Sequence, residues 1–148
     1  MKLDDVIFVL KAIPLFRKVE SDALRLLAFS ATRRQLRAGD VLFRKGEVSD
    51  GGYLILDGEV VLDTGDDGKP SQHAFKAGTL IGQTALFAPI ERSATAVARE
   101  PTSLLVFPRS LMGRVLDEHP RSALILRNAI ADDAKRLATT IERAAGSA

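Results

Sequence analysis

Cysteine is absent from the sequence, and histidine occurs only at His73 and His119. Without thiols there can be no disulfide, no thiolate metal site and no cysteine nucleophile. The two histidines lie far apart and lack the His-x-x-x-His spacing of a helical zinc site, so we expect no metal site. No Ser-His-Asp arrangement and no phosphate-binding P-loop motif is recognisable either, which argues against an enzyme.

A strong charge of either sign is also missing. The 21 basic and 19 acidic residues leave a formal net charge of +2, too little to give the field that non-specific nucleic-acid binding requires. No segment approaches the roughly 18 apolar residues of a membrane span, and the N-terminus lacks the apolar core of a signal peptide. We therefore expect a cytoplasmic protein with neither a nucleic-acid nor a membrane partner.

The length of 148 residues fits one domain, which we place over residues 1–148. In residues 1–32, apolar residues at helical spacing predict two short helices separated at Pro14. Ser21 precedes a second apolar run and is the expected N-cap of the second helix.

Residues 33–107 predict an antiparallel β-roll, because glycines separate short apolar runs at 41–43, 53–56 and 60–62. Asp57 and Gly58 suit a two-residue hairpin turn between two of these runs. Residues 65–68 suggest a second, looser hairpin before a strand at 72–75. We interpret Gly39, Gly46 and Gly58 as turn residues with positive φ.

Residues 109–146 carry helix-forming residues and few glycines. We predict a short helix over 109–116, a break at Pro120 and a long amphipathic helix over about 121–145. Its apolar seam comprises Ala123, Ile130, Ala134, Leu137, Ile141 and Ala144. Such a helix packs on the roll, on a partner helix or on both, and a homodimer through it is one possibility.

The strongest chemical signal is the segment 78–95. Gly82 is expected to end a strand, residues 83–87 to form one helical turn, and Pro89 to close it before Arg92. Backbone amides at the start of a helical turn, together with a guanidinium, bind a phosphate without any metal.

At this segment the sequence resembles the cyclic-nucleotide-binding domain family, which includes the catabolite activator protein, protein kinase regulatory subunits and nucleotide-gated channels. Residues 13–16 resemble the helical segment that precedes the family's roll, residues 39–47 its early strand pair, and residues 53–60 its core hairpin. The resemblance implies a mainly β fold with flanking helices, an antiparallel β-roll of jelly-roll type and a long C-terminal helix. It also implies a regulatory module for cAMP or cGMP that requires no cofactor.

Carried over by position, the resemblance assigns the ligand to two short runs, and the implied ligand-binding residues are Ile81, Gly82, Gln83, Thr84, Ala85, Arg92, Ser93 and Ala94. Arg92 would bind the cyclic phosphate and Ser93 would add a hydroxyl. Gln83 stands where the family normally has a glutamate that accepts a hydrogen bond from the ribose 2′-OH. Replacing a charged acceptor by a neutral one costs about 1 kcal/mol, or about tenfold in affinity.

Two functions are compatible with these residues. One is a cyclic-nucleotide sensor in signal transduction that acts on an effector protein. The other is a degenerate roll that serves protein interaction or dimerisation and binds no nucleotide. A transcription factor of the catabolite-activator type would need roughly 60 to 80 further residues for its helix-turn-helix, so we expect no DNA-binding domain in this chain.

Overall fold

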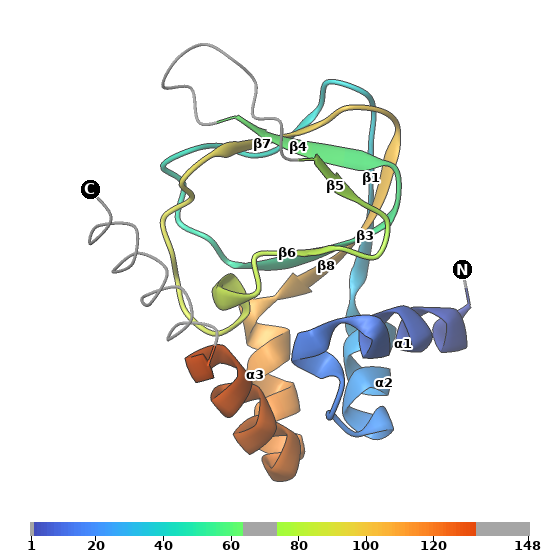
Figure 1. Cartoon of the computed structure of the whole chain (residues 1–148), viewed down its shortest axis with the longest axis vertical. Coiled ribbons are helices and arrows are strands. Elements are labelled where there is room, and N and C mark those ends of the chain that lie inside the picture. Colours follow the sequence, from blue (N-terminus) through green and yellow to red (C-terminus); the bar gives the residue numbers. More distant parts are fainter. Residues whose placement is uncertain (1, 64–73, 133–148) are drawn as a thin grey trace, which may run out of the picture.

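The computed structural model describes residues 2–63 and 74–132, and its strands form a rolled pair of antiparallel sheets (Figure 1). One sheet has the strand order β1-β8-β3-β6 and the other the order β2-β7-β4-β5. The strands are β1 (Thr32–Leu36), β2 (Val41–Phe43), β3 (Gly51–Asp57), β4 (Glu59–Asp63), β5 (Ala74–Lys76), β6 (Leu80–Ile81), β7 (Thr95–Ala98) and β8 (Thr102–Pro108). The β-roll expected from the spacing of the glycines is therefore confirmed.

Side chains on the inner faces of both sheets fill the middle of the roll. They include Tyr53 and Ile55 of β3, Val60 of β4, and Leu104 of β8. Leu54, between the first two, points to the opposite face of β3 and joins a second core under the helices. This alternation of side chains between two faces explains why β3 is buried over most of its length.

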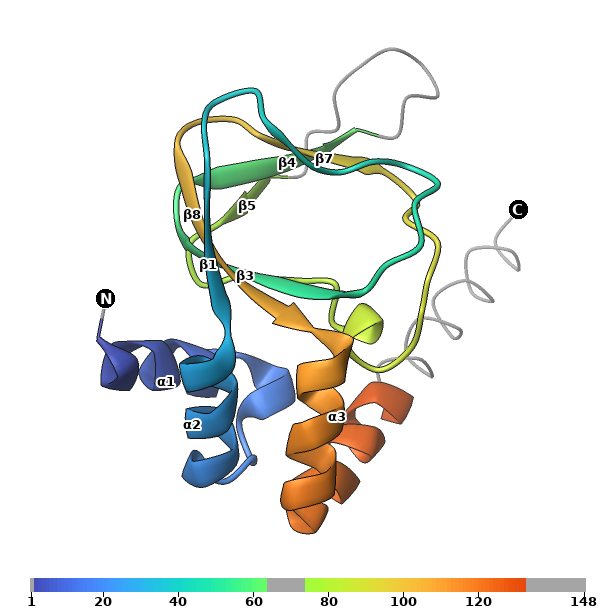
Figure 2. The same cartoon turned by 180° about the vertical axis from the view of Figure 1, so that it is seen from behind.

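The second core lies between the sheet that contains β1 and β8 and a layer of helices, which Figure 2 shows from behind. The helices are α1 (Leu3–Ala12), the 3-10 turn η1 (Pro14–Phe16), α2 (Ser21–Ser30) and α3 (Arg109–Glu118), followed by helical residues 120–132. Phe16, Leu24, Met112 and Leu126 are fully buried in this core. No helix in residues 2–63 and 74–132 combines the length and the apolarity that a membrane span needs.

The predicted break at Pro14 and the boundary before Pro120 are both present. The N-cap assignment was wrong by one residue: Glu20 is the N-cap of α2 and Ser21 is its first helical residue. The carbonyl of Glu20 already accepts the first bond, from the amide of Leu24 at 3.2 Å. The part of the long amphipathic helix after residue 132 lies outside the described residues.

The hairpin predicted at Asp57 and Gly58 was also wrong. Strand β3 pairs with β6 and β8, whereas β4 pairs with β5 and β7, so the chain crosses from one sheet to the other at Gly58. Gly58 does have a positive φ of 102°, and a Cβ at this position would overlap Thr102 and Pro101. Local sequence specified the bend, but tertiary pairing decided which sheet the next strand joins.

The antiparallel pairing predicted for the strands on either side of residues 65–68 is confirmed, because β4 and β5 are antiparallel neighbours with Val60 opposite Phe75. Residues 65–68, Gln72 and His73 lie outside the described residues. Positive φ angles occur at Gly39 and Gly46, as expected, and also at Gly78 and Gly82.

Candidate functional site

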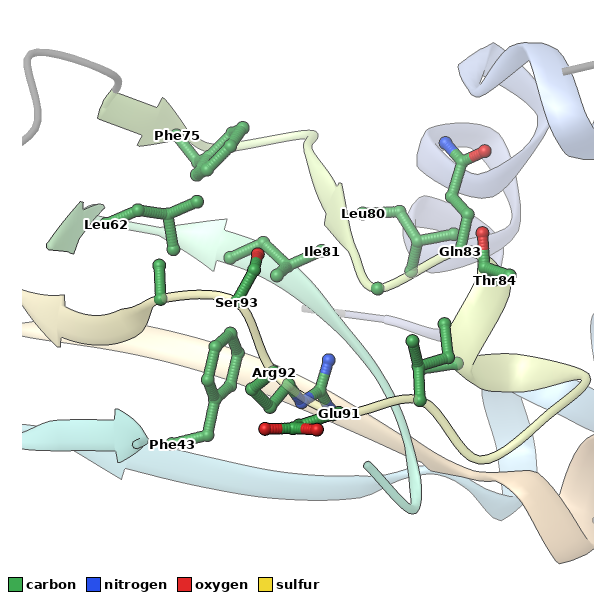
Figure 3. A pocket seen from close by; sticks show the side chains of 14 residues that line it. Phe43, Leu62, Phe75, Leu80, Ile81, Gln83, Thr84, Glu91, Arg92 and Ser93 are labelled. Atoms are coloured by element: carbon green, nitrogen blue, oxygen red, sulfur yellow. The ribbon is translucent and has the colours of Figure 1, made fainter. Parts of the chain in front are cut away.

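A cavity of about 290 Å³ opens on the roll beside β6, and Figure 3 shows its lining. All eight residues that the sequence resemblance assigned to the ligand border it. The full lining is Phe43, Leu62, Phe75, Leu80, Ile81, Gly82, Gln83, Thr84, Ala85, Ile90, Glu91, Arg92, Ser93 and Ala94. The segment 78–95 thus bends around one cavity, and strands from both sheets complete its walls.

One wall is the turn that follows β6. Gly82 has a φ of 83°, a conformation that favours glycine. The 3-10 turn η2 (Thr84–Leu86) follows, with Gln83 as its N-cap. The first amide of this turn to donate to a backbone carbonyl is that of Leu86, to Gln83 at 3.2 Å. The preceding amides therefore have no partner within the turn, as at any helical N-terminus.

The cavity lining holds two charged residues, the exposed Glu91 and the buried Arg92, whose exposed fraction is only 9%. Arg92 is the one charged residue that is buried within residues 2–63 and 74–132. Its Nη2 donates to the carbonyl oxygen of Gly51 at 3.0 Å, but no ion pair joins it to a carboxylate in the described part of the chain. A buried cation without an anionic partner is costly, so the arrangement is suited to an anion.

The backbone of Arg92 is held by the loop between β2 and β3. The amide of Gly46 donates to the carbonyl of Arg92 at 2.8 Å, and the amide of Arg92 donates to the carbonyl of Glu47 at 2.8 Å. Ser49 continues this pairing, because its amide bonds the carbonyl of Ile90 at 2.8 Å and its buried hydroxyl accepts from the amide of Ile90 at 2.9 Å. The sequence reading did not identify Ser49 as important.

Aromatic rings complete the surroundings of the guanidinium. The Cζ atom of Arg92 lies 4.2 Å from the centroid of the Phe43 ring and 5.8 Å from that of Tyr53. The two rings are stacked, with centroids 6.1 Å apart. Burial is the main cause that raises the pKa of Tyr53, and the Asp50 carboxylate adds to it, while the positive charge of Arg92 lowers it.

The cavity has an apolar end and a polar end (Figure 3). Leu62 and Phe75 project at one end, Gln83 and Thr84 stand at the other, and Arg92 and Ser93 lie between them. Ser93 is exposed, whereas Ala85 and Ala94 are buried. Such a cavity can hold an anionic group beside an apolar or aromatic body.

Sequence reasoning found eight lining residues of the segment 78–95 and missed the lining residues that come from elsewhere in the chain. Phe43, Leu62 and Phe75 were seen only as members of strands. Leu80, Ile90 and Glu91 lie within the segment 78–95 but were not assigned to the site. No group of three or more His, Asp or Glu side chains that could hold a metal ion occurs in the part of the chain that the structure describes.

Comparison with known proteins matches more than half of the chain to one family model. The sequence profile of the cyclic nucleotide-binding domain matches residues 33–119. The solved structure of a cyclic nucleotide-binding-like protein from Brucella abortus is 38% identical, with a TM-score of 0.71, and the match covers 77% of this chain and 99% of that one.

Two curated relatives are much longer than this chain. A cyclic nucleotide-gated potassium channel from Rhizobium etli is 39% identical over 94 residues, which are 64% of this chain and 25% of that protein. The lysophospholipase nte1 of Neurospora crassa is 34% identical over 99 residues, or 66% of this chain. This match spans only 6% of the lysophospholipase, so the chain is similar to one small part of that protein.

Proposed function

Because this chain belongs to the cyclic nucleotide-binding domain family, we propose that it binds a cyclic nucleoside monophosphate, cAMP or cGMP, in the cavity beside Arg92. Its role is that of a regulatory sensor module rather than a catalyst. The eight proposed ligand-binding residues are Ile81, Gly82, Gln83, Thr84, Ala85, Arg92, Ser93 and Ala94.

The observation that carries this proposal is the buried guanidinium of Arg92. A cyclic phosphate carries one negative charge, and its oxygens can accept from the guanidinium and from the amides at the start of η2. Ser93 follows Arg92 in the chain and is exposed, and its hydroxyl can donate to the cyclic phosphate. The phosphate would supply the anionic partner that Arg92 lacks among the described side chains.

The apolar end of the cavity suits the base. Leu62 and Phe75 project there (Figure 3), and the partly exposed side chains of both would lose water contact when a purine covers them. A cavity of about 290 Å³ is at the small end of the range for ligand sites, as expected for a ligand of this size.

Gln83 is the proposed partner of the ribose. Its amide oxygen can accept from the 2′-OH, and its side chain stands at the polar end of the cavity (Figure 3). A neutral acceptor binds a hydroxyl more weakly than a carboxylate does. We therefore expect a site of moderate affinity.

The alternative, a roll that has lost its ligand and serves only protein interaction, has less support. A degenerate site has no reason to keep a buried, unpaired cation, because that residue costs stability and performs no function. The predicted homodimer depends on a helix that lies partly outside the described residues.

Titration calorimetry tests the proposal with cAMP, cGMP and 5′-AMP on one preparation. We expect one site per chain for at least one cyclic nucleotide and much weaker binding of 5′-AMP, whose open phosphate is larger and more highly charged. If neither cyclic nucleotide produces heat or shifts the melting temperature at millimolar concentration, the proposed function is wrong.

A further inference from the structure

The aromatic ring of Phe43 contacts the guanidinium of Arg92. The guanidinium lies 4.2 Å from the ring centroid of Phe43, well inside the distance of about 6 Å that defines a cation–π interaction. Phe43 belongs to β2, at the edge of one sheet, whereas Gly51 belongs to the other sheet. The side chain of Arg92 is thus held from both sheets.

Three contacts restrict the guanidinium. Nη2 donates to Gly51, one face lies against Phe43, and the Tyr53 ring centroid is 5.8 Å from Cζ. An arginine side chain in solution has many rotamers, and these contacts select one of them before any ligand arrives. The charged edge that remains is directed into the cavity between Ser93 and Gln83 (Figure 3).

We infer that Phe43 is a positioning residue: its ring fixes the plane of the Arg92 guanidinium so that the binding site is formed in advance. A side chain that is already ordered does not lose its rotamer freedom on binding, and this saving strengthens the affinity. A flat aromatic face suits a flat guanidinium better than an aliphatic residue of similar size does. The consequence for affinity rests on the proposed function, but the geometry of the stack does not.

Phe43→Leu and Phe43→Tyr test this inference. Leucine keeps an apolar side chain but removes the ring, whereas tyrosine keeps the ring. In the ligand-free protein, the ring current of Phe43 should shift the Arg92 Nε–Hε proton signal upfield relative to exposed arginines. The signal is assigned by its loss in Arg92→Gln, and dispersed backbone amide spectra verify the fold of each variant.

We expect Phe43→Leu to move the Arg92 signal toward the position of an exposed arginine, and Phe43→Tyr to leave it shifted; the Tyr53 ring, 5.8 Å from Cζ, is present in every variant. Phe29→Leu is the control, because Phe29 is 78% exposed on α2 and its ring is outside the cavity. An Arg92 signal that does not move in folded Phe43→Leu would overturn the inference, whether or not the protein binds a nucleotide.

The affinity for cAMP provides a second readout. Loss of pre-ordering of one long side chain corresponds to about 2- to 12-fold in the dissociation constant. Phe43→Leu should weaken cAMP binding by that factor, whereas Phe43→Tyr should bind cAMP as tightly as the wild type does. The same substitution should cost nothing in the Arg92→Gln background. An equal loss in both backgrounds would mean that Phe43 contacts the ligand directly, and the positioning role would be wrong.

Discussion

Nη2 of Arg92 donates a 3.0 Å hydrogen bond to the carbonyl oxygen of Gly51, a residue 41 positions earlier in the chain. Gly51 begins β3, where a Cβ would overlap the backbone of Phe107 on β8. The phosphate-binding candidate is therefore tied directly to the central strands of the roll. This tie distinguishes Arg92 from an ordinary loop arginine.

Gly82→Ala should weaken cAMP binding more than Gly78→Ala does. Both glycines have positive φ, 83° and 89°, and an alanine in that region costs about 1 to 2 kcal/mol. At Gly82 the new Cβ would also lie 3.0 Å from Nη1 of Arg92, whereas at Gly78 it would meet nothing within 4 Å. Thermal melts should show similar destabilisation of the two variants, and calorimetry should show a loss of affinity in Gly82→Ala only.

Tyr53 is the only tyrosine in a chain without tryptophan, so its ionisation can be followed by ultraviolet absorbance. Its pKa should lie above the ordinary value of 10.0, chiefly because of burial. Arg92→Gln should raise the pKa further, because the positive charge lowers it in the wild type, and Asp50→Asn should lower it. A lower pKa of Tyr53 in Arg92→Gln, or a higher one in Asp50→Asn, would contradict the arrangement of charges around the ring.

The raised pKa of Tyr53 predicts how the free energy of unfolding depends on alkaline pH. The folded state binds the Tyr53 proton more tightly than the unfolded state does. The resulting contribution to the free energy of unfolding is fully present below about pH 10. It is lost as pH rises through the higher pKa of the folded protein. Denaturant unfolding should show a steeper decline above pH 10 in wild type than in Tyr53→Phe, and equal declines would show that Tyr53 titrates normally.

Gln83→Glu should tighten cAMP binding by up to about tenfold, the difference between a charged and a neutral hydrogen-bond acceptor. The 2′-deoxy analogue of cAMP is the control, since it has no hydroxyl to donate and should gain nothing. Calorimetry measures the change in affinity that Gln83→Glu causes for each of the two ligands. An equal gain for the deoxy analogue would mean that Gln83 does not face the ribose.

The turn and the arginine of the segment 78–95 could be predicted from sequence because they are close together along the chain. Gly82, the helical turn and Arg92 lie within a few residues of one another, and the turn chemistry of Gly82 is a local property. The roll itself followed from regularly spaced glycines and short apolar runs. Both kinds of signal are readable without knowledge of which strands pair.

The rest of the site depends on pairing between distant strands. Phe43 and Phe75 come from β2 and β5, on opposite edges of the same sheet, and nothing in their local sequence indicates that they line one cavity with Arg92. Similarly, Asp57 and Gly58 look like a hairpin turn, but the bend carries the chain from one sheet to the other. Long-range packing decided both outcomes.

The most direct test of the central claim is the affinity of Arg92→Gln for cAMP, measured by calorimetry beside Arg99→Gln. Arg99 is exposed and pairs with Glu59 at 3.3 Å, outside the cavity. Removing the guanidinium from a buried charge pair costs about 2 to 4 kcal/mol, so Arg92→Gln should weaken binding by roughly 30- to 700-fold. Arg99→Gln should bind like wild type. If Arg92→Gln folds and binds cAMP as tightly as wild type, Arg92 does not hold the phosphate and the proposed site is wrong.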